Sequence, residues 1–271
     1  MHPALLSAAL LLLAGPPATE PSPWTELAPG LEWSVLASPR PSERGDSMVR
    51  VLRIDPASWE FRLASSSMED PGRPRSAREW CRVGGFTAAI NASMYQKDSR
   101  SSVSLMRSGD HVNNPRLSKD RTLFAFAARA DSLPPVRIID RDCDDWEGVS
   151  QGYDAVVQSI RMVSCRGENV WAEQDRSTST AAIALDSQGR VLFIHVRSPY
   201  ATHDLIEILL ELPLDVERCM YTEGGAESQL YVTVDEFEAE SVGRVSFLAD
   251  DAAGRGWAVP NVVAIVPRET P

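Results

Sequence analysis

The chain has 271 residues, of which 43% are hydrophobic and 24% are charged, and its formal net charge is −11. This composition is typical of a globular protein with one large domain or two small ones. The negative charge argues against nucleic acid and anionic membrane surfaces as partners, because phosphates would be repelled. Only Lys97 and Lys119 are lysines. The abundant guanidinium groups suit bidentate contacts with single phosphates or carboxylates, although arginine-rich codon usage is the alternative explanation.

Residues 1–19 have the pattern of a signal peptide. They contain no Lys, Arg, Asp or Glu, and an almost unbroken apolar run over residues 4–14 ends at Gly15, Pro16 and Pro17. The run is shorter than the roughly 20 residues that span a bilayer, but it matches the core of a signal peptide that lacks the usual positive start. We therefore expect export to the periplasm or the outside, with no membrane insertion after the leader is removed. The alternative is a disordered start.

The four cysteines are Cys81, Cys143, Cys165 and Cys219. In an exported chain this even number permits two disulfides, and three pairings are open. Nearness and order in the sequence favour Cys143 with Cys165 and Cys81 with Cys219, and free buried thiols are the alternative. No pair has the close Cys-x-x-Cys spacing of a metal site.

Strand patterns dominate the first part of the domain. We place the domain at residues 45–267, after a segment 20–44 that holds a linker and the start of the domain. Ser76 and Glu79 form a capping-box pattern that predicts a helix over about residues 77–83. Apolar runs and alternation predict further strands. These strands are residues 31–38, 48–54, 59–64, 86–91, 122–128, 136–139 and 156–163.

The second part begins with a hairpin and an amphipathic helix. A strand–turn–strand pattern covers residues 180–197, and Leu205, Ile208 and Leu209 mark one face of a helix over residues 201–212. Many strands with two or three helices, and no regular β-α alternation, predict an α+β fold of strand-rich mixed sheets in a single domain. The remaining predicted strands are residues 219–222, 229–234 and 262–266.

The loop that follows residue 222 carries the strongest signal for chemistry. Gly224 and Gly225 stand directly after an apolar strand, where they let the backbone turn tightly and approach a ligand. Glu223 and Glu227 flank that turn, and glycoside cleavage uses two such neighbouring carboxylates. The alternative is a solvated hairpin with two surface glutamates.

Five further polar residues within or at the ends of strands are candidates for binding. An asparagine at a strand end can hold a turn or bind a sugar hydroxyl with its amide, and an arginine inside an apolar strand makes either an ion pair or an anion contact. A histidine on a strand can serve as acid, base or phosphate contact, or fill a structural place. We see no metal-ligand spacing and no cofactor motif, and we take the acidic stretch 140–147 as a solvated loop in preference to a calcium site. The candidates are Asn91, Gln158, Arg161, His195 and Arg197.

In their order along the chain, these segments resemble the phosphodiester glycosidase domain family, which includes the uncovering enzyme that removes N-acetylglucosamine from a mannose phosphate. The family's Ile-Asn-Gly-Gly-Phe/Tyr motif is similar to residues 90–95, and its Gln-Ser-Gly-Pro motif to residues 158–161. Its Arg-Thr-Ala-Ile-Gly strand is similar to residues 180–184, and its Asn-Leu-Asp-Gly-Gly-Gly-Ser-Ser loop to residues 221–228. The resemblance covers about residues 45–267.

The resemblance implies an exported hydrolase that cleaves a sugar-1-phosphodiester and takes a carbohydrate or sugar-phosphate substrate without a cofactor. It implies Glu223 as base or nucleophile, with Glu227 as the second catalytic carboxylate. Arg161 or Arg197 would hold the phosphate, helped by a donor such as His195. The remaining implied substrate contacts are Asn91, Gln158, Gly224, Gly225 and Ser228.

The chain departs from the family pattern at several positions. Ala92 and Ser93 replace both glycines of the first motif, and Thr180 replaces an arginine unless Arg176 or Arg161 substitutes for it. Glu223 stands where the family has Asp, and Glu227 where it commonly has Ser, so acidic character is kept. The missing glycines and the missing arginine favour the alternative function, a non-catalytic glycan-binding protein of the envelope. A third possibility is an envelope protein with no glycan site.

Overall fold

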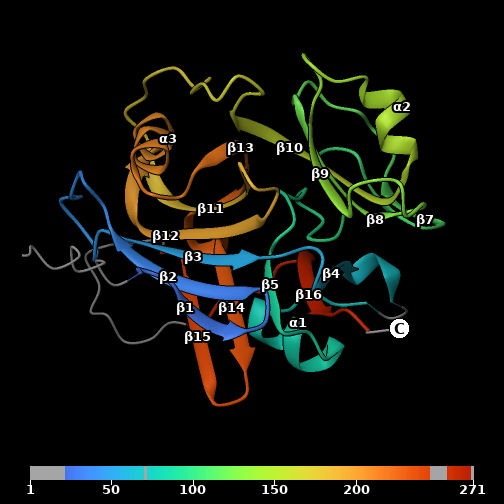
Figure 1. The fold of residues 1–271 in the computed structure, drawn as a ribbon, viewed down its shortest axis with the longest axis horizontal. Coiled ribbons are helices and arrows are strands. Elements are labelled where there is room, and N and C mark those ends of the chain that lie inside the picture. The colour runs from blue at the N-terminus through green and yellow to red at the C-terminus, as the bar shows by residue number, and fades with distance from the viewer. Residues whose placement is uncertain (1–21, 70–71, 245–254, 270–271) are drawn as a thin grey trace, which may run out of the picture.

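Strands rich in apolar residues form two sheets, and helices lie on their outer faces (Figure 1). The structure, a computed structural model, describes residues 22–69, 72–244 and 255–269. The strands of the larger sheet are β1 (Thr25–Ala28), β2 (Leu31–Ala37), β3 (Met48–Ile54), β6 (Met106–Ser108), β7 (His111–Asn114), β8 (Thr122–Ala128), β9 (Val136–Asp140), β10 (Tyr153–Val163), β11 (Ser177–Asp186), β12 (Val191–Ala201) and β13 (Val216–Gly224).

The larger sheet has the order β1-β2-β3-β12-β11-β13-β10-β6-β7, and β8 and β9 continue it from β10. The smaller sheet has the order β15-β14-β5-β16-β4, with β4 (Trp59–Ser65), β5 (Ala88–Asn91), β14 (Gln229–Val234), β15 (Phe237–Val242) and β16 (Asn261–Pro267). The chain passes from the larger sheet to the smaller one between β13 and β14. This crossing holds residues 223–228, with Glu223 and Glu227, and is called the glutamate loop below.

Within the described ranges, the helices are α1 (Ala77–Gly84), α2 (Trp146–Gln151) and α3 (Thr202–Glu211), with single 3₁₀ turns at η1 (Ser66–Met68) and η2 (Gly225–Glu227). The predicted capping box of α1 is present, since the Ser76 hydroxyl accepts from the Glu79 N–H at 3.3 Å and the Glu79 carboxylate accepts from the Ser76 N–H at 3.0 Å. Figure 1 shows α1 on the smaller sheet and α3 on the larger one.

The predicted α+β fold with strand-rich sheets in a single domain is confirmed. Each predicted strand is present, several with extended ends, and α3 lies where the apolar spacing placed it. Every strand pair in the described chain is antiparallel, so the sheets are antiparallel instead of mixed. The elements that the sequence did not predict are short or polar: β1, β6, β7, β15 and α2.

The main core lies between the inner faces of the two sheets and is built from large apolar side chains of both. Phe61 of the smaller sheet packs edge-on against Phe124 and Phe193 of the larger sheet, with ring centroids 5.8 and 6.0 Å apart. Burying such a side chain stabilises the fold by about 1.5–3 kcal/mol. A second cluster lies between the larger sheet and α3 and includes Leu205 and Leu209. The packing fixes both sheets against each other, and with them the crossing between β13 and β14.

One of the two expected disulfides is present. Cys143 and Cys165 are bonded, as expected, and join the segment after β9 to the end of β10. The expected pairing of Cys81 with Cys219 is wrong, because both are free and buried. Cys81 lies in the cluster between α1 and the smaller sheet, and Cys219 in the cluster under α3, so the main core separates them.

The expected signal peptide at residues 1–19 lies outside the described residues. The segment 20–44, expected to hold a linker and the start of the domain, contributes β1 and β2 to the edge of the larger sheet. Among the described residues, no helix has the length and apolar character needed to cross a membrane.

The cysteine assignment predicts how many thiols react with a thiol reagent. In denaturant without reductant, two of the four cysteines should react, and all four should react after reduction. In the native protein, reaction should be slow because Cys81 and Cys219 are buried. Cys81→Ser and Cys219→Ser should each remove one reactive thiol. A denatured protein with no reactive thiol would contradict the assignment.

Candidate active site

The glutamate loop begins at the last residues of β13, which runs between β11 and β10. Thr180 of β11 pairs with Gly224, and Ala181 pairs with Glu223. A Cβ atom at Gly224 would lie 2.0 Å from the Tyr221 hydroxyl, so a larger residue does not fit there. Gly225 has a φ of +70°, which only glycine adopts without strain, and this residue turns the chain into η2. Glycine is therefore required at these two positions for different reasons, a close contact at Gly224 and a positive φ at Gly225.

Glu223 is half-buried at this turn, and its loss of solvent raises the pKa of its carboxyl to about 7. The N–H of Gly224 donates to Glu223 Oε1 at 3.1 Å and lowers the pKa, whereas the negative charge of Glu227 raises it. The pKa therefore falls in the range where a carboxyl group can exchange protons near neutral pH. Two glutamates close enough to couple are the raw material for acid–base chemistry.

Asn91 holds the loop that carries Glu227. Its side-chain Nδ2 donates to the backbone oxygen of Glu227 at 2.9 Å, and its Oδ1 accepts from the N–H of Gln229 at 2.7 Å. Asn91 is 1% exposed. Both ends of its amide are therefore occupied by backbone, which gives it a positioning role at the end of β5.

His195 supports the same loop from β12. Its Nε2 lies 3.2 Å from both the backbone oxygen and the hydroxyl of Ser228, and its Nδ1 lies 2.6 Å from the Ser241 hydroxyl. Complete burial lowers the pKa of His195 to about 3, so the ring is neutral at physiological pH. The Ser228 hydroxyl in turn donates to the Gly225 backbone oxygen at 2.8 Å. His195 and Ser228, both predicted substrate contacts, are thus tied to each other.

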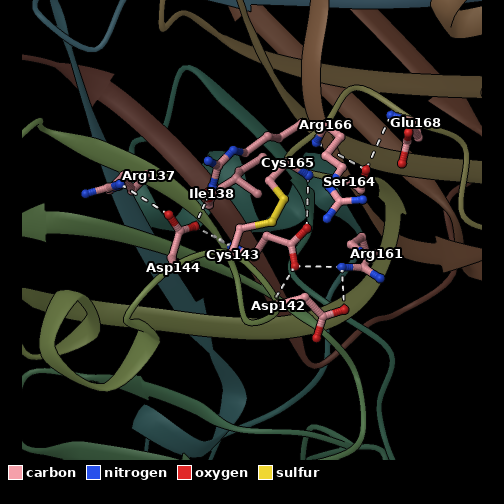
Figure 2. Close-up of a disulfide and its surroundings, with 12 residues drawn as sticks. Arg137, Ile138, Asp142, Cys143, Asp144, Arg161, Ser164, Cys165, Arg166 and Glu168 are labelled. Carbon is pink, nitrogen blue, oxygen red and sulfur yellow. Dashed lines mark hydrogen bonds and ion pairs between the residues drawn. A yellow bond between two sulfur atoms is a disulfide. The ribbon is translucent and has the colours of Figure 1, made fainter.

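Arg161 lies in an ion-pair cluster beside the disulfide (Figure 2). Its Nη1 lies 2.7 Å from Asp140 Oδ1 and 2.9 Å from Asp142 Oδ2. The N–H of Cys165 donates to Asp140 Oδ2 at 3.0 Å, which links the cluster to the Cys143–Cys165 bond. Of the two interpretations that the sequence left open, the ion pair is the one observed.

Gln158 is also occupied by protein groups. Its Oε1 accepts from the Ser118 N–H at 3.0 Å, and its Nε2 donates to the Asp120 backbone oxygen at 2.7 Å. Arg197 is half-buried on β12, and its backbone oxygen accepts from the Ser179 hydroxyl at 2.6 Å. Glu227 lines a cavity of about 1030 Å³, but Glu223, Gln158, Arg161, Arg197 and Ser228 are not among the described residues that line it.

That cavity brings Arg176 and Trp257 to the glutamate loop. Gly225, Ala226 and Glu227 form one side of the cavity, and Arg176 lines it from the segment before β11. Trp257 also lines the cavity and is 52% exposed. Of the two open substitutes for the family's arginine, Arg176 is thus the one that lines the same cavity as Glu227.

Two tyrosines lie within electrostatic reach of the glutamates. Burial raises the pKa of Tyr95 to about 12, with further contributions from Glu227 and Glu223. Burial and the charge of Glu223 also raise the pKa of Tyr221, against a lowering effect of Arg176. Both hydroxyls therefore stay protonated and can donate hydrogen bonds. Both tyrosines stand inside the motifs examined above, whereas nothing in the sequence marked Trp257.

The comparisons with known proteins agree with the predicted family and the fold. A family model described as Phosphodiester glycosidase matches residues 84–266, which confirms the resemblance drawn from the ordered motifs. No curated protein sequence matches the chain.

Two solved structures show a similar fold. The catalytic domain of zebrafish N-acetylglucosamine-1-phosphodiester alpha-N-acetylglucosaminidase, auto-inhibited by its pro-peptide, has a TM-score of 0.62 and 11% identity, with 89% of this chain and 85% of that chain covered. A hypothetical protein from Synechocystis has a TM-score of 0.59 and 12% identity, with 92% and 64% covered. At these identities the likeness establishes the fold.

The burial of Glu223 predicts a stability that depends on pH. Its pKa rises from an ordinary 4.5 to about 7 in the folded protein. The carboxyl group therefore has its full stabilising effect below pH 4.5 and loses it as the pH rises through 7, by roughly 3 kcal/mol in all. Glu223→Gln should unfold at a higher temperature than the wild type at pH 8.5 and at the same temperature at pH 4.5. If Glu223→Gln and the wild type melted at the same temperature at pH 8.5 as well as at pH 4.5, the burial of a charge at Glu223 would be contradicted.

Proposed function

We propose that this chain, which belongs to the phosphodiester glycosidase family, is an exported hydrolase that cleaves the bond between the anomeric carbon of a sugar and the phosphate of a sugar-1-phosphodiester. The observation that carries the proposal is the pair Glu223 and Glu227, one with a pKa of about 7 and the other lining a cavity that Arg176 also lines. The Cys143–Cys165 disulfide supports an oxidising compartment and hence export.

In this proposal Glu223 is the general base. The leaving group is a phosphate monoester, a stable anion, so cleavage needs a strong general acid less than ordinary glycoside hydrolysis does. Glu223 takes a proton from a water molecule whose oxygen forms the new bond to the anomeric carbon. The bond from that carbon to the phosphate oxygen breaks, and the phosphate leaves with the electron pair. A base with a pKa near 7 suits this step at neutral pH.

Glu227 and the neighbouring donors stabilise the two charges that develop. The Glu227 carboxylate faces the cavity and stabilises the positive charge on the sugar ring. Arg176 and the protonated hydroxyls of Tyr95 and Tyr221 donate to the phosphate and sugar oxygens. Arg176 takes the role that the sequence gave to Arg161 or Arg197.

Asn91 and His195 act through the backbone of the glutamate loop. Asn91 and His195 hold the segment from Gly225 to Gln229 in place, so their contribution to substrate binding is the fixed geometry of Glu227 and Ser228. Preorganised groups of this kind cost no reorganisation when the charge develops.

A glycan-binding protein without catalysis is the second candidate. The half-exposed Trp257 on the cavity favours it, because aromatic faces pack well against sugar rings. Such a protein would bind glycans with its two glutamates intact and release no sugar. Turnover is therefore the deciding measurement.

Substituting the two glutamates separates these functions. Glu223→Gln should lower kcat by about 10²- to 10⁴-fold, because the general base is lost. Release of free sugar from a panel of sugar-1-phosphodiesters measures this. Glu217→Gln is the matched control, since Glu217 is an exposed glutamate on the same strand. Full activity in Glu223→Gln would overturn the assignment, and no release by the wild-type protein would favour the binding function.

The pH profile gives a second test of the pair. In the wild type, kcat/KM should rise with pH through about 7, as Glu223 loses its proton. Glu227→Gln removes a negative charge that raises the pKa of Glu223, so the rise should move to lower pH in this variant. An unchanged inflection in Glu227→Gln would show that the two carboxyl groups do not interact.

The two arginines should differ in their effects. Arg176→Gln should lower kcat/KM by about 10- to 100-fold, because one charged hydrogen bond to the phosphate is lost. Arg161→Gln should lower the melting temperature, because Asp140 is left buried without its partner, and should leave kcat/KM close to wild type. A larger loss of kcat/KM in Arg161→Gln than in Arg176→Gln would reverse the assignment.

A further inference from the structure

The cavity that Glu227 lines is rich in arginine. Four arginines from three separate segments line it, against three carboxylates among the described lining residues, whereas the whole chain has a net charge of −11. The arginines are Arg40, Arg44, Arg176 and Arg244, and the carboxylates are Glu43, Asp204 and Glu227. The cavity is therefore a local concentration of guanidinium groups on an acidic protein.

The segment that presents Arg40 and Arg44 is fixed against the end of β12. The Ser42 hydroxyl donates to the Pro199 backbone oxygen at 2.9 Å, and the Tyr200 hydroxyl donates to the Arg40 backbone oxygen at 2.9 Å. The backbone that carries the two arginines is thus tied to the wall of the cavity. A ligand that reaches this wall meets charges whose positions the fold has set.

The two guanidinium groups differ in their own contacts. Arg40 lies 3.2 Å from Glu211 in an exposed ion pair, and such pairs contribute little in water. Arg44 forms no ion pair with another described residue and is exposed at the cavity. Asp204, one of the lining carboxylates, has its own neighbour, since its Oδ1 lies 3.3 Å from His203 Nδ1. Arg44 is thus a cation on this wall that breaks no ion pair with the described part of the chain when it binds a ligand.

The cavity is also larger than the sugar and the phosphate at the cleaved bond need. A cavity of about 1030 Å³ is at the upper end of sites for drug-sized ligands, so it has room beyond one sugar phosphate. Arg176 and Glu227 lie at the glutamate loop, whereas Arg40 and Arg44 come from the segment before β3. Arginines from separate chain segments that line one cavity suit a ligand with more than one anionic group.

We propose that the cavity contains a second phosphate subsite, formed by Arg40 and Arg44, which binds a phosphate on the leaving side of the substrate. The preferred substrate is then a sugar-1-phosphodiester whose alcohol part carries a further phosphate, as in an oligomer of sugar-phosphate units. This inference rests on the proposed hydrolase function and adds a substrate class to it. Bidentate contacts from arginine to a phosphate give such a subsite its selectivity.

The test compares two substrates with the same sugar and the same scissile group. N-acetylglucosamine-1-phosphoglycerol has a neutral glycerol end, and its matched partner carries a phosphate on that glycerol. For the wild type we expect kcat/KM to be about 10- to 100-fold higher for the phosphorylated substrate. Arg44→Gln should bring this ratio of kcat/KM values close to one. In the wild type, added salt should reduce the ratio. Arg62→Gln, an exposed arginine paired with Glu60 on β4, is the control and should keep the wild-type ratio.

Calorimetry with Glu223→Gln separates this inference from the proposed function. If no substrate is cleaved by the wild type, tighter binding of the phosphorylated compound that depends on Arg44 would still establish the subsite. If both substrates are cleaved equally well, the subsite is disproved and the hydrolase stands. Absence of binding and of cleavage for the phosphorylated compound would overturn the subsite. A loss in Arg44→Gln that is equal for both substrates would also overturn it.

Discussion

The constraint on which the site depends is the burial of the Glu223 carboxyl group next to Glu227. A carboxylate that loses water and lies near a second negative charge is unstable in its charged form, which is why its pKa rises to about 7. Such an arrangement survives only where the surrounding structure fixes both side chains. The rest of the site consists of groups that do so.

Those groups come from both sheets, because the glutamate loop is the crossing between them. β13 ends the larger sheet's contribution at Gly224, and β14 begins in the smaller sheet at Gln229. Asn91 holds the loop from the smaller sheet, and His195 holds it from the larger one. The packing of Phe61 against Phe193 keeps the two sheets in register with each other. A shift between the sheets would therefore move Glu227 relative to Glu223.

The arginines near the disulfide and those at the cavity differ in their partners. Near the disulfide, Arg161 is neutralised by Asp140 and Asp142, so that cluster contributes to the stability of the fold (Figure 2). At the cavity, Arg44 is exposed and forms no ion pair with another described residue. The same residue type therefore serves the fold in one place and is available to a ligand in the other.

By itself, the sequence determined what depends on near neighbours in the chain. The alternation of apolar residues placed the strands, the Ser76 and Glu79 pair began α1, and the ordered motifs identified the family and the glutamate loop. Tertiary structure alone decided which cysteines pair, which arginine is neutralised and which one reaches the cavity. The reason is physical. Periodicity and turn chemistry act over a few residues, whereas burial and the partners of a charge depend on which distant segments the packing brings together.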